Sequence, residues 1–418
     1  MTNLPKIILK PHKEAFVRAG HPWIFSNAIE GGPVDEDRRR VSEVGLVQIL
    51  ANDGKFLGVG MFNPKTSISV RMLSTDENVV VDKEFFKKRF SELEERKKRF
   101  LPNETTGYRL VNADADWLPG LIIDRYEDVF VFQIHTAGMD IFRDIIIEAL
   151  KEAFDAAAIV ERSDIDARKQ DYLTPLPVKT HHGNIDGPVL FKENGVKFFV
   201  DVLTGQKTGF FLDQRDARRK IGELANGRAT GHAGGGYDGQ GKKVLNLFAY
   251  TGGFGLYAAL NGAAKVTTID ISEPAIKLAK ENFKINGLAV NDEKYDFICA
   301  DVFDYLNSNE IKSEMFDLII CDPPAFAKSN DKVDQAKKAY TDLNMRCMEL
   351  LKEGGILMTS SCSGRITQED FRDILKISAG RSRKDLRVLA TLAQPFDHTE
   401  RVCFPEGRYL KTFVLECI

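Results

Sequence analysis

The chain has 418 residues, of which 28% are charged and 43% hydrophobic, and its 58 basic and 61 acidic side chains give a formal net charge of −3. This composition excludes disordered, collagen-like and coiled-coil proteins, and the length predicts two or three domains. Residues 1–14 lack the apolar segment of a signal peptide, and no apolar run approaches the roughly 18 residues of a membrane helix. We therefore expect a cytoplasmic protein that does not contact a membrane.

The near-neutral charge, taken alone, argues against a nucleic-acid partner, because contacts to phosphate need Lys and Arg. Six cysteines are spread along the chain without a CxxC pair or a Cys/His spacing typical of metal sites. This spacing argues against a bound metal and against a disulfide framework.

Residues 1–75 are predicted to form a small β-rich domain. They contain short apolar runs broken by turns, and Asn52-Asp53-Gly54 predicts a hairpin because glycine readily accepts a positive φ. Ten Lys or Arg and seven Asp or Glu make this segment mildly basic.

Residues 76–187 are predicted to form an α+β domain. Apolar residues at helical spacing predict an amphipathic helix over residues 81–99, followed by two strands within 108–136, a helix and a further strand. The basic run at residues 87–100 would supply local positive charge, although such runs more often form a solvated helix face.

From residue 188 onward, strands and helices alternate, which predicts a parallel sheet with helical crossovers and an α/β, Rossmann-like domain over residues 188–418. A glycine-rich segment, from about Asn226 to Gly241, is expected to form a flexible surface loop. The predicted strands cover residues 243–249, 265–270, 296–301, 316–322 and 354–361.

Functional side chains follow these strands. The first strand runs into the glycine-rich turn at residues 249–255, and the next three end in Asp270, Asp301 and Asp322. The carboxyl ends of strands form the ligand crevice of open α/β sheets, and a carboxylate such as Asp270 can accept both hydroxyls of a ribose. A strict GxGxxG motif is absent, which favours an adenosyl ligand without a pyrophosphate. Each aspartate could instead cap a helix.

Further candidate site residues follow the fourth and fifth predicted strands. Asp322-Pro323-Pro324-Ala325-Phe326 predicts a rigid turn in which Phe326 offers a surface for stacking a base. Cys362 follows the fifth strand, and its position favours a catalytic role over the alternative of a buried small hydrophobe. Cys321 precedes Asp322 within a strand and is interpreted as a core residue.

The stretches LNLFAYTGGFGLYAA, DPPAFAKS and SSCSG resemble class I S-adenosylmethionine-dependent RNA methyltransferases, specifically the bacterial 23S rRNA 5-methylcytosine methyltransferase family. The resemblance continues in RLVNADADWLPGLIIDRY, FVDVLTGQKTGFFLDQRDAR and HTERVCFPEGRYLKTF, so it covers nearly the whole chain. It implies a PUA domain that binds RNA at residues 1–75, a central α+β domain at 76–187 and a class I methyltransferase domain at 188–418.

The resemblance also implies roles for individual residues, with S-adenosyl-L-methionine as cofactor and no metal. Cys362 is the expected nucleophile and Asp322 the expected base-binding residue. The expected cofactor-binding residues are Phe248, Ala249, Tyr250, Thr251, Gly252, Gly253, Asp270, Ile271, Ser272, Asp301, Val302, Asp322 and Pro323. The residues themselves suggest Lys207, Phe211, Asp213, Arg215, Pro324 and Phe326 as substrate-binding. For residues 205–215 the alternative is a polar segment that leads into the first strand of the sheet.

The implied reaction is methylation of C5 of a cytosine in 23S rRNA, either naked or within an assembling large ribosomal subunit, through a covalent bond between Cys362 and C6. Alternatives are 5-methyluridine formation, guanine methylation and a non-catalytic RNA-binding ribosome-assembly factor. His398 and Lys411 are weaker candidates for the site. The group that promotes deprotonation of Cys362, the acceptor of the C5 proton and the formation of a homodimer are left open.

Overall fold

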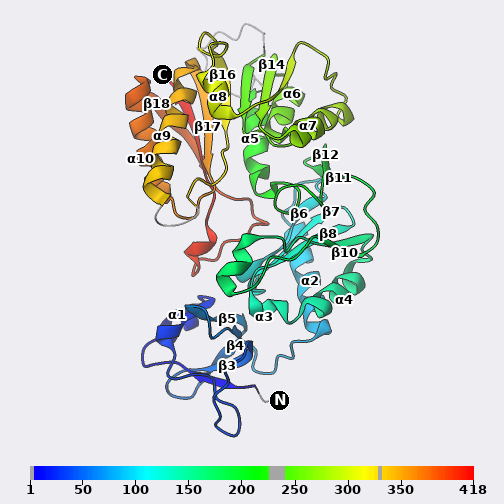
Figure 1. Cartoon of the computed structure of the whole chain (residues 1–418), viewed down its shortest axis with the longest axis vertical. Coiled ribbons are helices and arrows are strands. Elements are labelled where there is room, and N and C mark those ends of the chain that lie inside the picture. Colours follow the sequence, from blue (N-terminus) through cyan, green and yellow to red (C-terminus); the bar gives the residue numbers. More distant parts are fainter. Residues whose placement is uncertain (1–3, 226–240, 328–331) are drawn as a thin grey trace. The chain divides into compact units, whose positions relative to one another are not determined.

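The computed structural model describes residues 4–225, 241–327 and 332–418 and divides them into two compact units (Figure 1). The predicted glycine-rich loop lies almost wholly outside the described residues. The units do not follow the three predicted segments, because the chain crosses between them more than once. Unit 1 comprises Met1–Gly195, Val200–Leu212 and Phe396–Gly407, and unit 2 comprises Val196–Phe199, Asp213–Pro395 and Arg408–Ile418.

The N-terminal part of unit 1 is a five-stranded sheet with the order β1-β3-β4-β5-β2. The predicted hairpin is confirmed, since β3 pairs antiparallel with β4 and Gly54 between them has a φ of +83°. The elements are β1 (Lys6–Ile8), α1 (Glu14–Arg18), β2 (Trp23–Phe25), β3 (Gly45–Leu50), β4 (Phe56–Phe62) and β5 (Ile68–Ser74).

The second part of unit 1 is a five-stranded sheet with the order β10-β9-β8-β7-β6. The predicted helix over residues 81–99 is confirmed as α2, but the prediction of two strands within 108–136 is wrong. Three strands form there, because Glu127, with a φ of +56°, begins a tight turn between two buried apolar strands. The elements are α2 (Lys83–Lys98), β6 (Gly107–Asn112), β7 (Leu121–Tyr126), β8 (Val129–Ile134), α3 (Ala137–Asp140), α4 (Arg143–Phe154), β9 (Ala158–Glu161) and β10 (Lys179–His182).

A buried ion pair attaches the segment Phe396–Gly407 to α2. The side chains of Lys97 and Asp116 are each 1% exposed, and the Lys97 ammonium lies 2.8 Å from the carboxylate. Lys97 also donates to the carbonyl of Asp397 at 2.9 Å, and Thr399 donates to Asp116 at 2.9 Å. These contacts explain why residues so late in the sequence belong to unit 1.

Unit 2 contains a seven-stranded sheet with the order β15-β14-β13-β16-β17-β19-β18. The first five strands in this order are parallel, as predicted, whereas β19 runs antiparallel to both β17 and β18. The strands are β13 (Lys243–Leu247), β14 (Lys265–Asp270), β15 (Tyr295–Cys299), β16 (Phe316–Cys321), β17 (Leu351–Ser361), β18 (Leu386–Leu392) and β19 (Lys411–Cys417). A separate two-stranded sheet pairs β11 (Val189–Glu193) with β12 (Val196–Val200).

Helices cover both faces of the large sheet (Figure 1). Helices α5, α6 and α7 pack in sequence over β13, β14 and β15, while α9 and α10 pack together over β16 and β17. The helices are α5 (Arg215–Ala225), α6 (Gly253–Leu260), α7 (Glu273–Ile285), α8 (Val302–Asn307), α9 (Val333–Glu349) and α10 (Gln368–Ser382). Among the described residues, no helix is long and apolar enough to cross a membrane.

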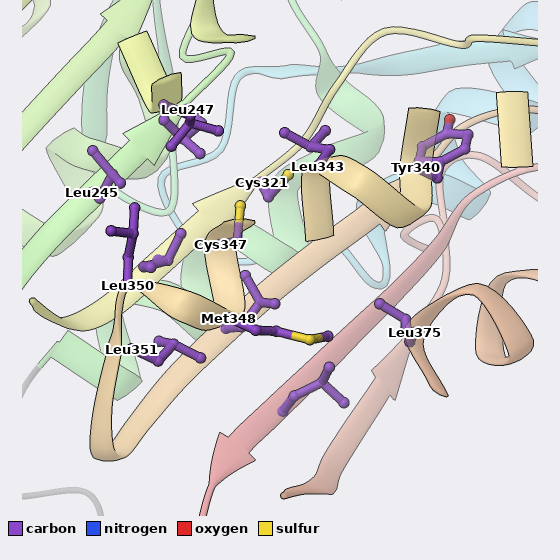
Figure 2. Packing of buried hydrophobic residues seen from close by; sticks show 14 of the residues in the cluster. Leu245, Leu247, Cys321, Tyr340, Leu343, Cys347, Met348, Leu350, Leu351 and Leu375 are labelled. Carbon is purple, nitrogen blue, oxygen red and sulfur yellow. The ribbon is translucent and has the colours of Figure 1, made fainter. Parts of the chain in front are cut away.

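The core under α9 explains the role of Cys321. Figure 2 shows Cys321 of β16 beside Cys347 of α9, surrounded by leucine side chains. Both cysteines are fully buried, and burial raises the pKa of the Cys321 thiol well above its usual value. The interpretation of Cys321 as a core residue is confirmed.

Replacing Lys97 with Met is expected to lower the free energy of unfolding by about 3–5 kcal/mol, because it leaves the Asp116 carboxylate buried without its cation. Urea unfolding followed by circular dichroism measures the change. The matched control is Lys98→Met on the same helix, where the lysine side chain is 58% exposed. The control should lose less than about 1 kcal/mol, and an equally small loss for Lys97→Met would contradict a stabilising buried pair.

Candidate active site

The predicted site residues of unit 2 lie where parallel strands end at one edge of the sheet. Strand β13 pairs with β14 on one side and with β16 on the other, so the strand order reverses at this point. Loops that leave the carboxyl ends of strands at such a reversal diverge and form a crevice. The ends of β13, β14, β15 and β16 and the loops that follow them carry the predicted cofactor residues, Asp322 among them.

The loop after β13 has an unusual backbone held by Asp270. Phe248 and Tyr250 have φ values of 54° and 47°, and Gly252 has a φ of 78°. Left-handed conformations at residues other than glycine store strain and persist only where other contacts impose them. Here the Tyr250 amide donates to Asp270 at 2.7 Å, and the Ala249 amide donates to the Ile269 carbonyl at 2.9 Å.

The carboxylate of Asp270 organises two loops at once. One oxygen accepts from Tyr250, and the other accepts from the Ser272 amide at 2.9 Å. Each carboxylate oxygen has a further lone pair, so Asp270 retains the capacity to accept hydroxyl groups of a ribose. Beside it, Ser272 caps α7, and the side chain of Ile271 is exposed.

The glycines of this loop let it pack closely against neighbouring helices. A Cβ atom on Gly252 would lie 2.9 Å from Ala279 Cβ of α7, and one on Gly253 would lie 2.9 Å from Cδ of the Arg218 side chain of α5. Helix α6 begins at Gly253, and its first amides can bind an anionic group such as the carboxylate of an amino-acid moiety. The neighbouring Thr251 is buried, and its carbonyl accepts from Asn282 at 3.0 Å. The helix amides and the Asp270 carboxylate together fit S-adenosylmethionine.

Asp301 has the capping role that the sequence left open as an alternative. Its side chain accepts from the amides of Phe303 at 2.8 Å and Asp304 at 3.1 Å, at the start of α8. The side chain of Val302 is buried in the core, so only its main chain can face a ligand. The cofactor contacts predicted for both residues stay predictions.

The loop after β17 brings Cys362 to the turn that follows β16. Cys362 is half-buried, and its Sγ lies 4.0 Å from the carbonyl oxygen of Pro323. The Ser363 hydroxyl donates to the Ala327 carbonyl at 3.0 Å, which ties the two loops together. The predicted nucleophile therefore lies within contact distance of the Asp322-Pro323-Pro324 turn.

Lys411, a weaker candidate from the sequence, contacts the loop that carries Cys362. It lies opposite Ser361 in the antiparallel pairing of β19 with β17. Its buried ammonium donates to the carbonyls of Ser363 at 2.6 Å and Ile366 at 2.7 Å and so holds the cysteine loop. Burial lowers the pKa of Lys411 to about 8, while negative charge on Cys362 raises it. A lysine at the start of the apolar strand KTFVLEC was the signal that could have identified it.

Phe326 is less available for stacking than predicted. Its half-buried ring packs on Tyr340 at a centroid distance of 4.7 Å and on Phe303 at 6.1 Å, whereas Pro324 is exposed. The ring of Phe303 in turn lies 6.2 Å from that of Phe248. These contacts join the loops after β13 and β16 through aromatic packing.

The remaining predicted substrate residues are divided between the two units, because the chain passes from one to the other after Leu212. In unit 1 the Lys207 ammonium lies 4.5 Å from the ring centroid of Phe211. In unit 2 Asp213 is buried and accepts from the Tyr409 hydroxyl at 2.7 Å. Arg215 is 0% exposed, and its predicted contact with substrate stays a prediction. His398, in unit 1, is buried beside Asp397.

Comparisons with known proteins agree with this geometry. The sequence matches the S-adenosylmethionine-dependent methyltransferase family over residues 189–400 and a PUA-like domain over residues 7–75. A solved structure described as a SAM-dependent methyltransferase from Streptococcus mutans has a TM-score of 0.78 at 25% identity, covering 99% of this chain and 100% of that one. A methyltransferase structure complexed with SAH has a TM-score of 0.80 at 25% identity and the same coverage.

Curated relatives align along nearly the whole chain. Proteins named ribosomal RNA large subunit methyltransferase I from Shewanella frigidimarina and Shewanella amazonensis are 38% and 39% identical, each over 98% of this chain and 98% of their own length. The PUA-like domain, the Rossmann-like methyltransferase domain and S-adenosyl-L-methionine as cofactor are confirmed. The chain thus belongs to the family of S-adenosylmethionine-dependent methyltransferases whose members are named ribosomal RNA large subunit methyltransferase I.

Proposed function

We propose that this protein methylates C5 of a cytosine in 23S ribosomal RNA, with Cys362 as the nucleophile. The contact between Cys362 Sγ and the Pro323 carbonyl, beside the cofactor loops, carries the proposal. The names of the relatives support a large-subunit ribosomal RNA as substrate, and the PUA-like domain supports binding of RNA.

The chemistry requires a cysteine because C5 of a pyrimidine is only weakly nucleophilic. The Cys362 thiolate adds to C6, and the electrons of the C5–C6 double bond make C5 electron-rich. S-adenosylmethionine, when bound, would supply an electrophilic methyl group at this edge of the sheet. C5 would take this methyl group as the bond between the methyl carbon and the sulfonium sulfur breaks. After C5 loses its proton, the bond between sulfur and C6 breaks, the double bond forms again and Cys362 is released as thiolate.

Two further residues support this step. Asp322 follows β16 beside the Pro323 carbonyl that Cys362 contacts, and we assign it to the base edge at N3, where a protonated carboxyl group can donate a hydrogen bond. The Lys411 ammonium stabilises negative charge on Cys362 and fixes the loop that carries it. Only a thiolate is nucleophilic, so a nearby cation increases the reactive fraction.

Replacing Cys362 with Ala is expected to abolish transfer of labelled methyl groups to unmodified 23S rRNA while leaving affinity for S-adenosylmethionine within about twofold, since the cofactor loops keep their internal contacts. Transfer is measured by scintillation counting and affinity by calorimetry. The matched control is Cys299→Ala, at an exposed cysteine on β15, which should retain activity. Undiminished transfer by Cys362→Ala would overturn the covalent mechanism.

The product of the wild-type protein is expected to be 5-methylcytosine, identified by mass spectrometry of nucleosides from the methylated RNA. The same measurement separates the alternatives, because 5-methyluridine or a methylated guanine would each appear as a different nucleoside. Absence of both cofactor binding and methylation would favour a non-catalytic assembly factor. Mapping the modified nucleotide in rRNA from cells with and without this protein would locate the target.

Replacing Lys411 with Met is expected to slow alkylation of Cys362 by iodoacetamide several-fold at neutral pH, because the thiolate loses its neighbouring cation. A lysine with a pKa of about 8 is mostly charged at neutral pH and loses this charge as the pH rises through that value. The difference in alkylation rate between the wild type and Lys411→Met should therefore shrink above pH 8. Lys411→Arg, which keeps the charge, should restore part of the rate.

The control for this experiment is Lys384→Met. Lys384 also donates to a backbone carbonyl, that of Leu351 at 2.9 Å, but Leu351 begins β17 and Ser361, next to Cys362, ends it. Alkylation is followed by mass spectrometry of the peptide that contains Cys362. Equal rates for Lys411→Met and wild type at neutral pH would show that Lys411 has only a structural role.

A further inference from the structure

The basic run on α2 is mostly paired, apart from two arginines. Most of its cations have carboxylate partners within the same unit: Lys83 and Lys87 with Glu152, Lys97 with Asp116, Lys98 with Glu94, and Arg99 with Glu95. Among the described residues, Arg89 and Arg96 have no carboxylate oxygen within the 4.0 Å of an ion pair. Seven positions apart, they lie on the same face of the helix, two turns from each other.

A third arginine reaches the same place from the segment Phe396–Gly407. Arg401 packs its guanidinium on the ring of Trp117, 4.7 Å from the centroid. Its Nε is buried and has no hydrogen-bond partner among the described residues. The three arginines, with Leu93 and Trp117, line a cavity of about 180 Å³.

The charges around this cavity do not balance. Two carboxylates line the cavity. Asp116 already accepts hydrogen bonds from the Lys97 ammonium, the Asn112 amide and the Thr399 hydroxyl. Glu92 is exposed and lies 4.0 Å from Lys88. Burial lowers the pKa of Arg89, the Glu92 charge opposes this shift and the neighbouring charge of Arg96 adds to it. Guanidinium groups withdrawn from water without a partner are costly, and an anion in the cavity would offset that cost.

We propose that this cavity binds a phosphate group of the RNA backbone. Guanidinium groups present paired N–H donors in a planar fork that matches two phosphate oxygens, and the stacking of Arg401 on Trp117 fixes the direction of its fork. Partly buried Arg89 and Arg401 form the inner side of the site, and exposed Arg96 forms its rim. The choice of RNA over a free phosphate rests on the proposed RNA substrate, and the site itself lies in unit 1, outside the methyltransferase chemistry.

The test measures binding of a fluorescein-labelled single-stranded fragment of 23S rRNA to the full chain by anisotropy over a series of salt concentrations. All proteins carry Cys362→Ala, and no cofactor is added, so the result does not depend on the proposed reaction. The variants are Arg89→Gln with Arg401→Gln, and Arg96→Gln alone, whose exposed position protects it from misfolding. The control is Lys88→Gln on the same helix, where the lysine side chain is 80% exposed.

We expect the arginine variants to bind RNA several-fold more weakly at low salt. The slope of log affinity against log salt should become less steep by about 0.7 for each phosphate that a variant no longer neutralises, while Lys88→Gln should change it by clearly less. Unchanged affinity and slope in folded arginine variants would overturn the proposal. The proposal would also be overturned if inorganic phosphate bound to the cavity while the variants left RNA affinity unchanged, because the cavity would then be a site for free phosphate. Binding to vesicles of anionic phospholipid that disappears in the variants while RNA binding persists would also overturn it.

Discussion

The candidate active site depends on the pairing of β13 between β14 and β16. Because these strands are parallel and the order reverses at β13, the loops after them leave the same edge of the sheet in diverging directions. The glycine loop, Asp270 and the Asp322 turn therefore lie at one edge of the sheet although they are separated in the sequence. The hydrogen bond from the Tyr250 amide to Asp270 then fixes the strained backbone of the loop.

The position of Cys362, the proposed nucleophile, depends on a different pairing. Strand β19 comes from the end of the chain and lies antiparallel to β17, which places Lys411 opposite Ser361. From that position one ammonium group holds two carbonyls of the cysteine loop and interacts electrostatically with Cys362. Burial also lowers the pKa of Lys411 to about 8, so the positive charge near Cys362 is expected to decrease as the pH rises through this value.

The net charge of −3 says little about RNA binding, since what matters is which cations remain unpaired. On α2, acidic side chains neutralise most of the lysines, and a buried pair with Asp116 uses another to attach the segment Phe396–Gly407. That attachment also brings Arg401 to Arg89 and Arg96. The contacts that attach the segment Phe396–Gly407 to α2 thus place three arginines around one small cavity.

The sequence by itself determined the elements whose signals are local. The alternation of strand and helix segments located the strands of the parallel sheet, the spacing of phenylalanines located α2, and the ends of those strands predicted roles for Asp270, Asp322 and Cys362. Glu127 shows a limit of this reasoning, because a two-residue turn between apolar runs resembles a short interruption of one strand. Tertiary structure alone decided the burial of Arg215, the position of Lys411 and the meeting of Arg401 with α2. Each of these depends on contacts between residues far apart in the chain or on burial by other elements, and local sequence does not specify such neighbours.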